Sequence, residues 1–203
     1  MRLPLPCPAR LARPAVLAGL LLALSACGSS PPVSLYRLRA DPPAAAAAAA
    51  VAPTRWMLGS VRLPDYLDRD AILWPSGETG LKALPGQRWA EPLRDAVPRV
   101  LRGDLARLRG ADRVWAAPMP TGLKADRVLK VEIQTYEVQP DGQTLVLAAR
   151  WWLTDPEGQA PTQVRLFERR EPLAGSSADA LVQAHRAALW ALAQAIATQG
   201  DHP

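Results

Sequence analysis

The chain has 203 residues, with 24 Lys and Arg against 19 Asp and Glu, so its formal charge at pH 7 is +5. Arg2, Arg10 and Arg13 are the charged residues before Cys27, so 21 basic and all 19 acidic residues follow, a formal charge of +2 after residue 26. The charges are nearly balanced, and no basic cluster with interleaved aromatic residues is present. The chain therefore lacks the usual signature of a nucleic-acid-binding protein.

The first 26 residues have the layout of an export signal. A basic start is followed by a short apolar core from Ala15 to Leu24, which falls short of a comfortable membrane span. Leu24, Ser25, Ala26 and Cys27 then resemble the lipobox of bacterial lipoproteins, which implies cleavage between Ala26 and Cys27. The alternatives are a cleaved signal with an incidental cysteine, or an uncleaved membrane helix.

The lipobox resemblance implies a diacylglyceryl thioether and an N-acyl chain on Cys27, and no other cofactor is expected. A thiol is nucleophilic enough for this alkylation, and two or three acyl chains anchor a protein durably where one holds it only reversibly. Residues 27–32 would form a lipidated flexible tether. Gly28 and Ser29 follow, without the Asp that favours inner-membrane retention in enterobacterial lipoproteins, so the expected location is the periplasmic face of the outer membrane.

Residues 33–203 are expected to form one domain with its own packed core. The second cysteine, Cys7, falls within the signal, so this domain has no thiol for a disulfide or a zinc site. About 170 residues are enough for a single hydrophobic core. No later apolar run is long enough to span a membrane.

Hydrophobic periodicity and turn residues predict the elements of this domain in chain order. These are a strand at 34–39, an Ala/Pro-rich loop at 41–53, a strand at 55–63, a turn at 66–69, a hairpin from 71–74 and 80–84, a helix at 91–108, a strand at 114–115, a meander at 126–138, 144–154 and 163–170, and a helix from about 176 to 199. This order favours an α+β fold, with two long helices packed on a mixed, largely antiparallel sheet.

Local patterns add expectations about individual residues. The alternation in 126–138 places Leu129, Val131, Ile133 and Thr135 on one face, and Pro75 is expected to break the strand before it. Ser176 with Asp179 resembles a capping box at the last helix, while Pro98 leaves the straightness of the first helix in doubt. The six arginines between 88 and 109 have acidic residues among them and predict a solvated helical face.

Two motifs carry a resemblance that covers the layout of the whole mature chain. Residues 58–69 read LGSVRLPDYLDR and residues 88–93 read RWAEPL. In this order, between the lipobox and a C-terminal helix, they resemble the ABC-type transport auxiliary lipoprotein family. The resemblance implies a noncatalytic periplasmic subunit of a trans-envelope ABC/MCE-type phospholipid transport system that supports membrane integrity. Its partner would be a membrane-anchored MCE-domain tunnel protein, and it would form a ring-shaped homo-oligomer.

The partner surface is hypothesised from exposed aromatic and charged residues near these motifs. It would include Tyr66, Arg69, Trp89, Glu91 and Trp152, although Trp89 also fits a packing role at the start of the helix. Trp152 and Phe167 could together mark a partner surface, or a second helix could cover them. The alternative function is a stand-alone lipid or lipopolysaccharide chaperone lipoprotein.

The mature chain contains few residues or motifs that are typical of enzyme active sites. Its only histidines are His185, on the apolar stripe of the last helix, and His202, in the tail. No triad, zinc motif, dinucleotide fingerprint or phosphate loop is present. Asp65, Asp68 and Asp70 leave a paired-carboxylate glycosidase site as a minor alternative. The prediction is that the protein is not an enzyme.

Overall fold

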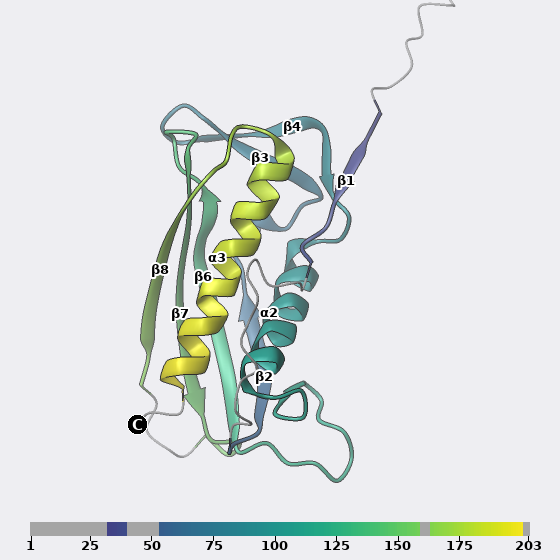
Figure 1. The fold of residues 1–203 in the computed structure, drawn as a ribbon, viewed down its shortest axis with the longest axis vertical. Coiled ribbons are helices and arrows are strands. Elements are labelled where there is room, and N and C mark those ends of the chain that lie inside the picture. Colours follow the sequence, from purple (N-terminus) through teal and green to yellow (C-terminus); the bar gives the residue numbers. More distant parts are fainter. Residues whose placement is uncertain (1–31, 40–52, 159–162, 201–203) are drawn as a thin grey trace, which may run out of the picture. The chain divides into compact units, whose positions relative to one another are not determined.

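The computed structural model describes residues 32–39, 53–158 and 163–200 (Figure 1). The predicted signal, the Cys27 lipidation site, His202 and nearly all of the Ala/Pro-rich loop lie outside these residues. The chain divides into Met1–Pro32 and Val33–Pro203. The architecture below concerns the second unit alone, which is an α+β domain as predicted.

Eight strands, two long helices and one short 3-10 helix make up the described part of this unit. The strands are β1 Ser34–Tyr36, β2 Trp56–Arg62, β3 Ala71–Ser76, β4 Gly80–Trp89, β5 Val114–Ala116, β6 Arg127–Val138, β7 Thr144–Thr154 and β8 Arg165–Pro172. The helices are η2 Asp65–Leu67, α2 Leu93–Arg109 and α3 Ala178–Gln199. Every predicted element within the described residues is therefore present.

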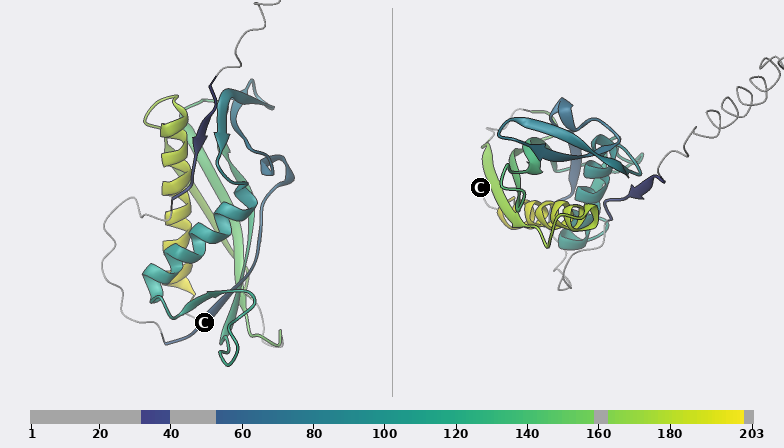
Figure 2. Two further views of the ribbon diagram at one scale, coloured as in Figure 1. Left: turned by 90° about the vertical axis from the view of Figure 1, so that its right-hand side faces the viewer. Right: turned by 90° about the horizontal axis from the view of Figure 1, so that it is seen from above.

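The larger sheet has the strand order β5-β2-β6-β7-β8. Strand β2 runs parallel to β5 and β6, while β6, β7 and β8 form the predicted antiparallel meander. Both α2 and α3 lie over one face of this sheet (Figure 2). We call this the inner face, and the core lies there because apolar residues of β6 and β7 meet the apolar stripes of the two helices.

The smaller sheet has the order β1-β4-β3, with β1 parallel and β3 antiparallel to β4. The prediction that Pro75 breaks the strand is wrong, because β3 continues through it to Ser76. Strand β3 is at the edge of its sheet, where a residue without an N–H donor costs no ladder hydrogen bond. Its partner β4 is also longer than predicted, ending at Trp89 instead of Leu84.

An irregularity in β6 corrects the predicted core face. Ile133 pairs with Ala149, but Thr135 pairs with Ala148, so the register shifts by one residue between them. Such a slip exchanges the two faces of a strand. Thr135 therefore leaves the inner face, and Tyr136 and Val138 enter the core instead. Alternation along one strand cannot reveal an extra residue that is defined only by the partner strand.

Helix α2 begins at Leu93, two residues later than predicted, with Pro92 in an extended conformation at the N-cap. The helix continues through Pro98. The predicted solvated face needs two corrections. Arg88 lies in β4 and not in the helix. Arg109 is buried, with its guanidinium 3.4 Å from the ring centroid of Trp56. Its Nη2 also donates to the Thr54 hydroxyl at 2.9 Å, so this arginine joins α2 to the start of β2.

Helix α3 is capped by Ser177, not by Ser176. The Ser177 hydroxyl accepts a hydrogen bond from the Ala180 N–H at 3.1 Å, while Asp179 accepts from the Gln183 side chain. The predicted reciprocal capping box is therefore absent from this helix start, since Ala180 stands where it needs Glu or Gln. The predicted apolar stripe is confirmed, because every member is buried: Leu181, His185, Ala188, Leu189, Leu192 and Ile196.

Candidate functional site

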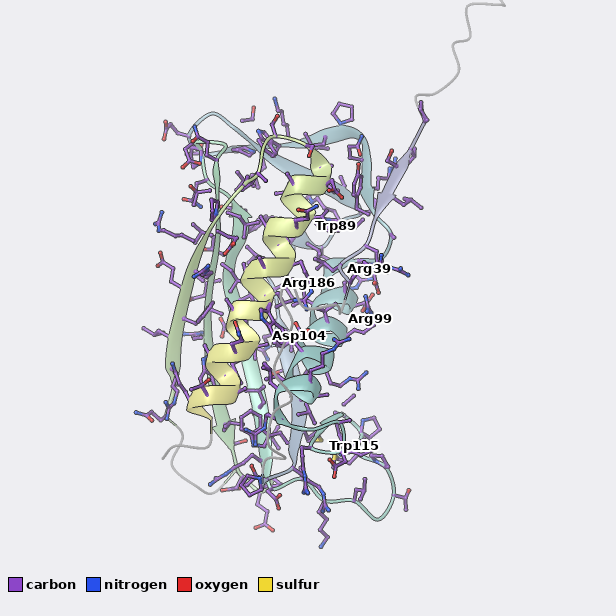
Figure 3. All side chains as sticks on the ribbon, viewed as in Figure 1. Arg39, Trp89, Arg99, Asp104, Trp115 and Arg186 are labelled. Carbon is purple, nitrogen blue, oxygen red and sulfur yellow. The ribbon has the colours of Figure 1, made fainter. Side chains whose placement is uncertain are left out.

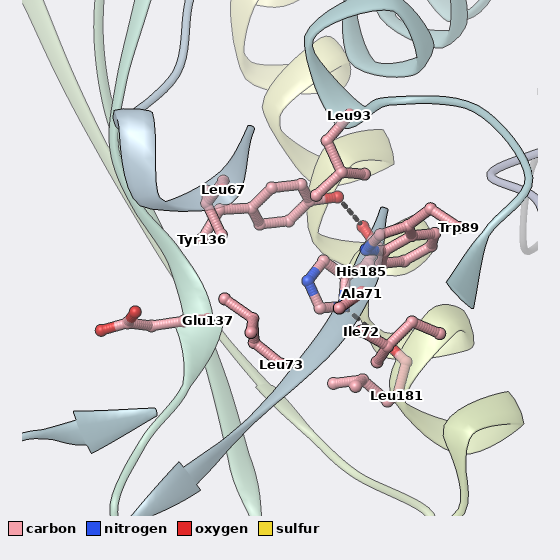
Figure 4. Close-up of a pocket in the computed structure, with 10 residues that line it drawn as sticks. All are labelled: Leu67, Ala71, Ile72, Leu73, Trp89, Leu93, Tyr136, Glu137, Leu181 and His185. Atoms are coloured by element: carbon pink, nitrogen blue, oxygen red, sulfur yellow. Dashed lines mark hydrogen bonds between the residues drawn. The ribbon is translucent and has the colours of Figure 1, made fainter. Parts of the chain in front are cut away.

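A small cavity lies between the end of β6, the smaller sheet and α3 (Figure 4). Its volume is about 20 Å³ and its lining is mostly apolar, with Tyr136, Glu137 and His185 as its titratable residues. The His185 ring packs against Trp89 with centroids 5.4 Å apart and against Tyr136 at 4.5 Å. The space is large enough for one water-sized group and far too small for an organic substrate.

The polar atoms around His185 are paired within the fold. Its Nδ1 lies 2.9 Å from the Leu181 carbonyl, and the Tyr136 hydroxyl donates to the His185 carbonyl at 2.6 Å. Burial lowers the pKa of His185 to about 4, against a smaller opposing effect of the Leu181 and Tyr136 backbone groups. This imidazole is therefore neutral at neutral pH, as expected of a satisfied core histidine.

Two of the three acidic residues considered for glycosidase chemistry form exposed ion pairs, and the third, Asp65, is exposed at the start of η2. Asp68 lies 2.6 Å from Arg94 of α2, and Asp70 lies 2.8 Å from Arg88 of β4. Exposed pairs of this kind contribute little to stability, typically below about 1 kcal/mol. Among the residues that the structure describes, no group of three His, Cys, Asp or Glu side chains is placed to hold a metal ion.

The outer face of the larger sheet carries a row of apolar side chains. Strand register places Met57 beside Trp115 and Val128, and it places Trp152 beside Lys130. Leu166 lies opposite Arg150 on the same face, and it is 80% exposed. These five apolar residues, one from each strand, form what we call the outer row: Met57, Trp115, Val128, Trp152 and Leu166.

Trp152 and Phe167 lie on opposite faces of the sheet. Phe167 pairs with the buried Ala149, so it faces inward and packs against the core, while α3 contacts its strand β8. Trp152 pairs with Lys130 on the outer face. The predicted common surface of these two residues is therefore wrong. Within the part of the chain that the structure describes, both long helices lie over the face of Phe167 and neither lies over that of Trp152.

The remaining predicted partner residues do not gather into one patch. Trp89 is only 6% exposed and packs on His185, so it is not a surface residue, and a packing role at the start of α2 accounts for it. Glu91 forms an ion pair with Arg99. Arg69 is exposed beside η2. Tyr66 is half-buried, and burial with the nearby Glu137 carboxylate raises its pKa.

Tyr66 and Trp152 lie near opposite ends of β6. The Glu137 carboxylate, near the end of the strand, is close enough to Tyr66 to raise the pKa of that phenol, while Trp152 pairs with Lys130 near the start of the strand. The seven-residue separation corresponds to about 23 Å along a strand. Sequence reasoning missed four members of the outer row: Met57, Trp115, Val128 and Leu166. Charged residues occur on both faces of β8, so its alternation alone does not indicate which way Leu166 points.

Residues 36–197 match the family described as the ABC-type transport auxiliary lipoprotein component. The chain belongs to this family. The resemblance carried by residues 58–69 and 88–93 is thus confirmed, and the auxiliary lipoprotein family favours a noncatalytic role in transport. Within the described ranges, no helix is both long and apolar enough to cross a membrane.

Solved structures support the fold of this auxiliary lipoprotein. One protein described as uncharacterized is 20% identical with a TM-score of 0.65, and the match covers 84% of this chain and 100% of that chain. A protein from Xanthomonas campestris is 17% identical with a TM-score of 0.64, over 83% of this chain and 98% of that chain. At these identities the likeness shows the fold alone. No curated protein gives a significant match.

Proposed function

We propose that this auxiliary lipoprotein is a noncatalytic periplasmic subunit of a trans-envelope ABC/MCE-type phospholipid transport system. It would be anchored to the outer membrane through acyl chains on Cys27 and would dock a membrane-anchored MCE-domain tunnel protein there. The match of residues 36–197 to a transport auxiliary lipoprotein carries this proposal. The lipobox sequence at residues 24–27 supports the anchor.

The physical logic rests on the cost of moving acyl chains through water. Phospholipid tails that cross the periplasm need a continuous apolar sleeve, because exposing them to water is unfavourable. A lipid-anchored domain at the membrane end of such a sleeve is present at high local concentration, so it can dock without tight intrinsic affinity. By its resemblance to paraquat-inducible protein C, a member of the family, the domain would dock as a ring-shaped homo-oligomer.

The outer row is the surface that best suits docking in this proposal. Leu166 is 80% exposed, and Trp152 lies partly exposed on the same face. Exposed apolar side chains gathered on one face are typical of protein interaction sites, and Trp residues are frequent binding hot spots. The Glu132–Arg150 ion pair at 2.8 Å lies within the same face and adds a polar rim.

Capture from envelope extracts tests the proposal. The tagged full-length lipoprotein is cross-linked in cells, purified, and its partners are identified by mass spectrometry. We expect an MCE-domain membrane protein to be enriched, with cross-links to peptides that contain Trp152 or Leu166. Enrichment of no MCE-domain protein, under conditions in which another envelope complex is recovered intact, would contradict the proposal.

A groove beside α3 gives some support to the alternative, a lipid-carrying chaperone, because it combines arginines with apolar side chains. The two functions differ in their partners. A stand-alone chaperone would retain lipid when purified and would bind no MCE-domain protein, whereas the proposed subunit requires that protein.

A further inference from the structure

A groove with a volume of about 690 Å³ lies between the N-terminal half of α3 and the segment formed by β1 and residues 37–39. Its lining includes three arginines and three apolar side chains: Arg37, Arg39, Arg186, Leu35, Tyr36 and Val182. Asp179 is its one carboxylate, and this residue accepts a hydrogen bond from Gln183. The lining therefore combines an excess of positive charge with apolar surface.

The groove follows from two simple periodicities. Asp179, Val182, Gln183 and Arg186 are spaced i, i+3, i+4 and i+7, so they form one stripe along α3. Across from this stripe, the chain at 37–39 alternates like a strand. Leu38 is buried in the core, so Arg37 and Arg39 point to the opposite side and are both exposed.

The groove floor is held rigidly by contacts to α2. Arg186 is buried, and its Nη2 lies 2.7 Å from Asp104 of α2, so its guanidinium has a defined position. Figure 3 shows Arg39 and Arg186, which come from the segment after β1 and from α3. Arg99 of α2 donates from Nη2 to the Leu38 carbonyl at 3.2 Å and fixes the backbone between Arg37 and Arg39.

We propose that this groove binds one anionic phospholipid, with its phosphate headgroup between Arg37 and Arg39. Arg37 and Arg39 are the exposed arginines of the lining, so a headgroup that approaches from solvent meets their guanidinium groups first, whereas Arg186 is buried against Asp104. Guanidinium groups pair with phosphate oxygens through charge-assisted, often bidentate hydrogen bonds. Leu35, Tyr36 and Val182 offer apolar contacts for the glycerol and the first acyl carbons, and Leu35 is 67% exposed, so its side chain is open to a ligand in the groove.

The position of the groove in the chain fits a ligand taken from a bilayer, and this step rests on the proposed function. Leu35 is eight residues after Cys27, and eight residues span at most about 29 Å when extended. If Cys27 carries the membrane anchor, the groove lies within reach of the lipid surface.

Titration with soluble lipids tests the groove directly. The described core lies within Val33–Pro203, so residues 27–203 with Cys27→Ser can be studied without an acyl anchor. Three probes are titrated below their micelle concentrations by calorimetry: dihexanoyl phosphatidylglycerol, dihexanoyl phosphatidylcholine and glycerol 3-phosphate. They separate an anionic amphiphile from a zwitterionic amphiphile and from a free phosphate ester.

We expect one phosphatidylglycerol probe to bind per chain, at least tenfold more tightly than either of the other probes. Arg37→Ser with Arg39→Ser should weaken this binding at least tenfold, as should Val182→Asp. The control is Arg62→Ser with Arg127→Ser, which removes the same charge from exposed positions on β2 and β6 and should change the affinity less than twofold. Unchanged thermal midpoints would show that the groove variants fold.

Several results would overturn the proposal. Equal binding of glycerol 3-phosphate would indicate a plain anion site, and equal binding of phosphatidylcholine would show that charge does not select the ligand. Equal weakening by the control variant would indicate nonspecific charge attraction, and absence of phosphatidylglycerol binding would remove the site altogether. None of these results affects capture of an MCE-domain protein by the same variants, so failure here is distinguishable from failure of the proposed function.

Discussion

Asp104 of α2 and Arg186 of α3 form a buried ion pair that links the two long helices. Arg186 Nη2 lies 2.7 Å from Asp104 Oδ1, and the side chains are 9% and 0% exposed. Arg107 lies farther from the same carboxylate oxygen, at 3.7 Å. Burial raises the pKa of Asp104 to about 6, although Arg186 and Arg107 act in the opposite direction. The cost of desolvation thus outweighs the attraction between the charges.

Removing one member of this pair should destabilise the domain strongly. Asp104→Ala leaves the buried Arg186 without its carboxylate, which typically costs about 3–5 kcal/mol of unfolding free energy. Urea denaturation measures this loss. Arg94→Ala, which removes the exposed pair with Asp68, is the matched control and should cost less than about 1 kcal/mol. The double variant Asp104→Leu with Arg186→Met should recover most of the stability. A loss below about 1 kcal/mol for Asp104→Ala would contradict this interpretation.

His185 and Asp104 should have opposite effects on stability below neutral pH. The folded pKa of His185 is lowered from 6.5 to about 4, so its contribution is present above pH 6.5 and is lost as the pH falls toward 4. The folded pKa of Asp104 is raised from 3.8 to about 6, so its contribution is present below pH 3.8 and is lost as the pH rises through 6. Near pH 5 the change of unfolding free energy with pH caused by His185 should therefore largely cancel the change caused by Asp104.

Variants of these residues should separate the two effects. Asp104→Asn should make stability fall more steeply than in the parent between pH 6.5 and 4, since unfolding then takes up the His185 proton without compensation. His185→Leu should do the reverse, so stability rises as the pH falls from 6 to 4. The measurement is the urea midpoint at half-unit pH steps. Identical slopes for the parent and both variants would show that neither group titrates as described.

Replacing the lipobox cysteine should release the protein from the membrane. Cys27→Ala removes the thiol that accepts the diacylglyceryl group, so no acyl chain holds the chain to a bilayer. We expect the variant to lose its membrane fractionation and to weaken membrane integrity, as measured by detergent sensitivity. Cys7→Ala is the control, because Cys7 precedes the cleavage site and should have no effect. Unchanged fractionation of Cys27→Ala would exclude this anchor.

Charge placed in the outer row should weaken docking without unfolding the domain. Leu166→Glu or Trp152→Glu introduces a carboxylate that would have to be desolvated at an apolar interface. Each should reduce capture of the MCE-domain partner at least tenfold and shift the thermal midpoint little, because these side chains face outward. Leu81→Glu places the same charge on a leucine that is 40% exposed on β4, and it should capture the partner normally. Equal capture by all variants would place the docking surface elsewhere.

Sequence alone determined the order of the elements and the apolar faces of the helices. Leu93, Val97 and Leu101 repeat at helical spacing and are all buried on α2, and Leu181 and Leu189 behave in the same way on α3. Such faces are predictable because the period belongs to a single segment and the hydrophobic effect acts on it directly. The family motifs are likewise local, since they are short runs at residues 58–69 and 88–93.

Which segments meet in the folded domain could be read only from the three-dimensional structure. The register shift that brings Tyr136 into the core depends on β7, the burial of Arg109 depends on Trp56, and the groove requires residues 37–39 to lie beside α3. The strand register of β7 with β6 and β8 was likewise needed to place Trp152 and Phe167 on opposite faces of the sheet. Each of these relationships joins residues distant in the chain. Their geometry is set by strand pairing and close packing, which leave no periodic signal in either segment alone.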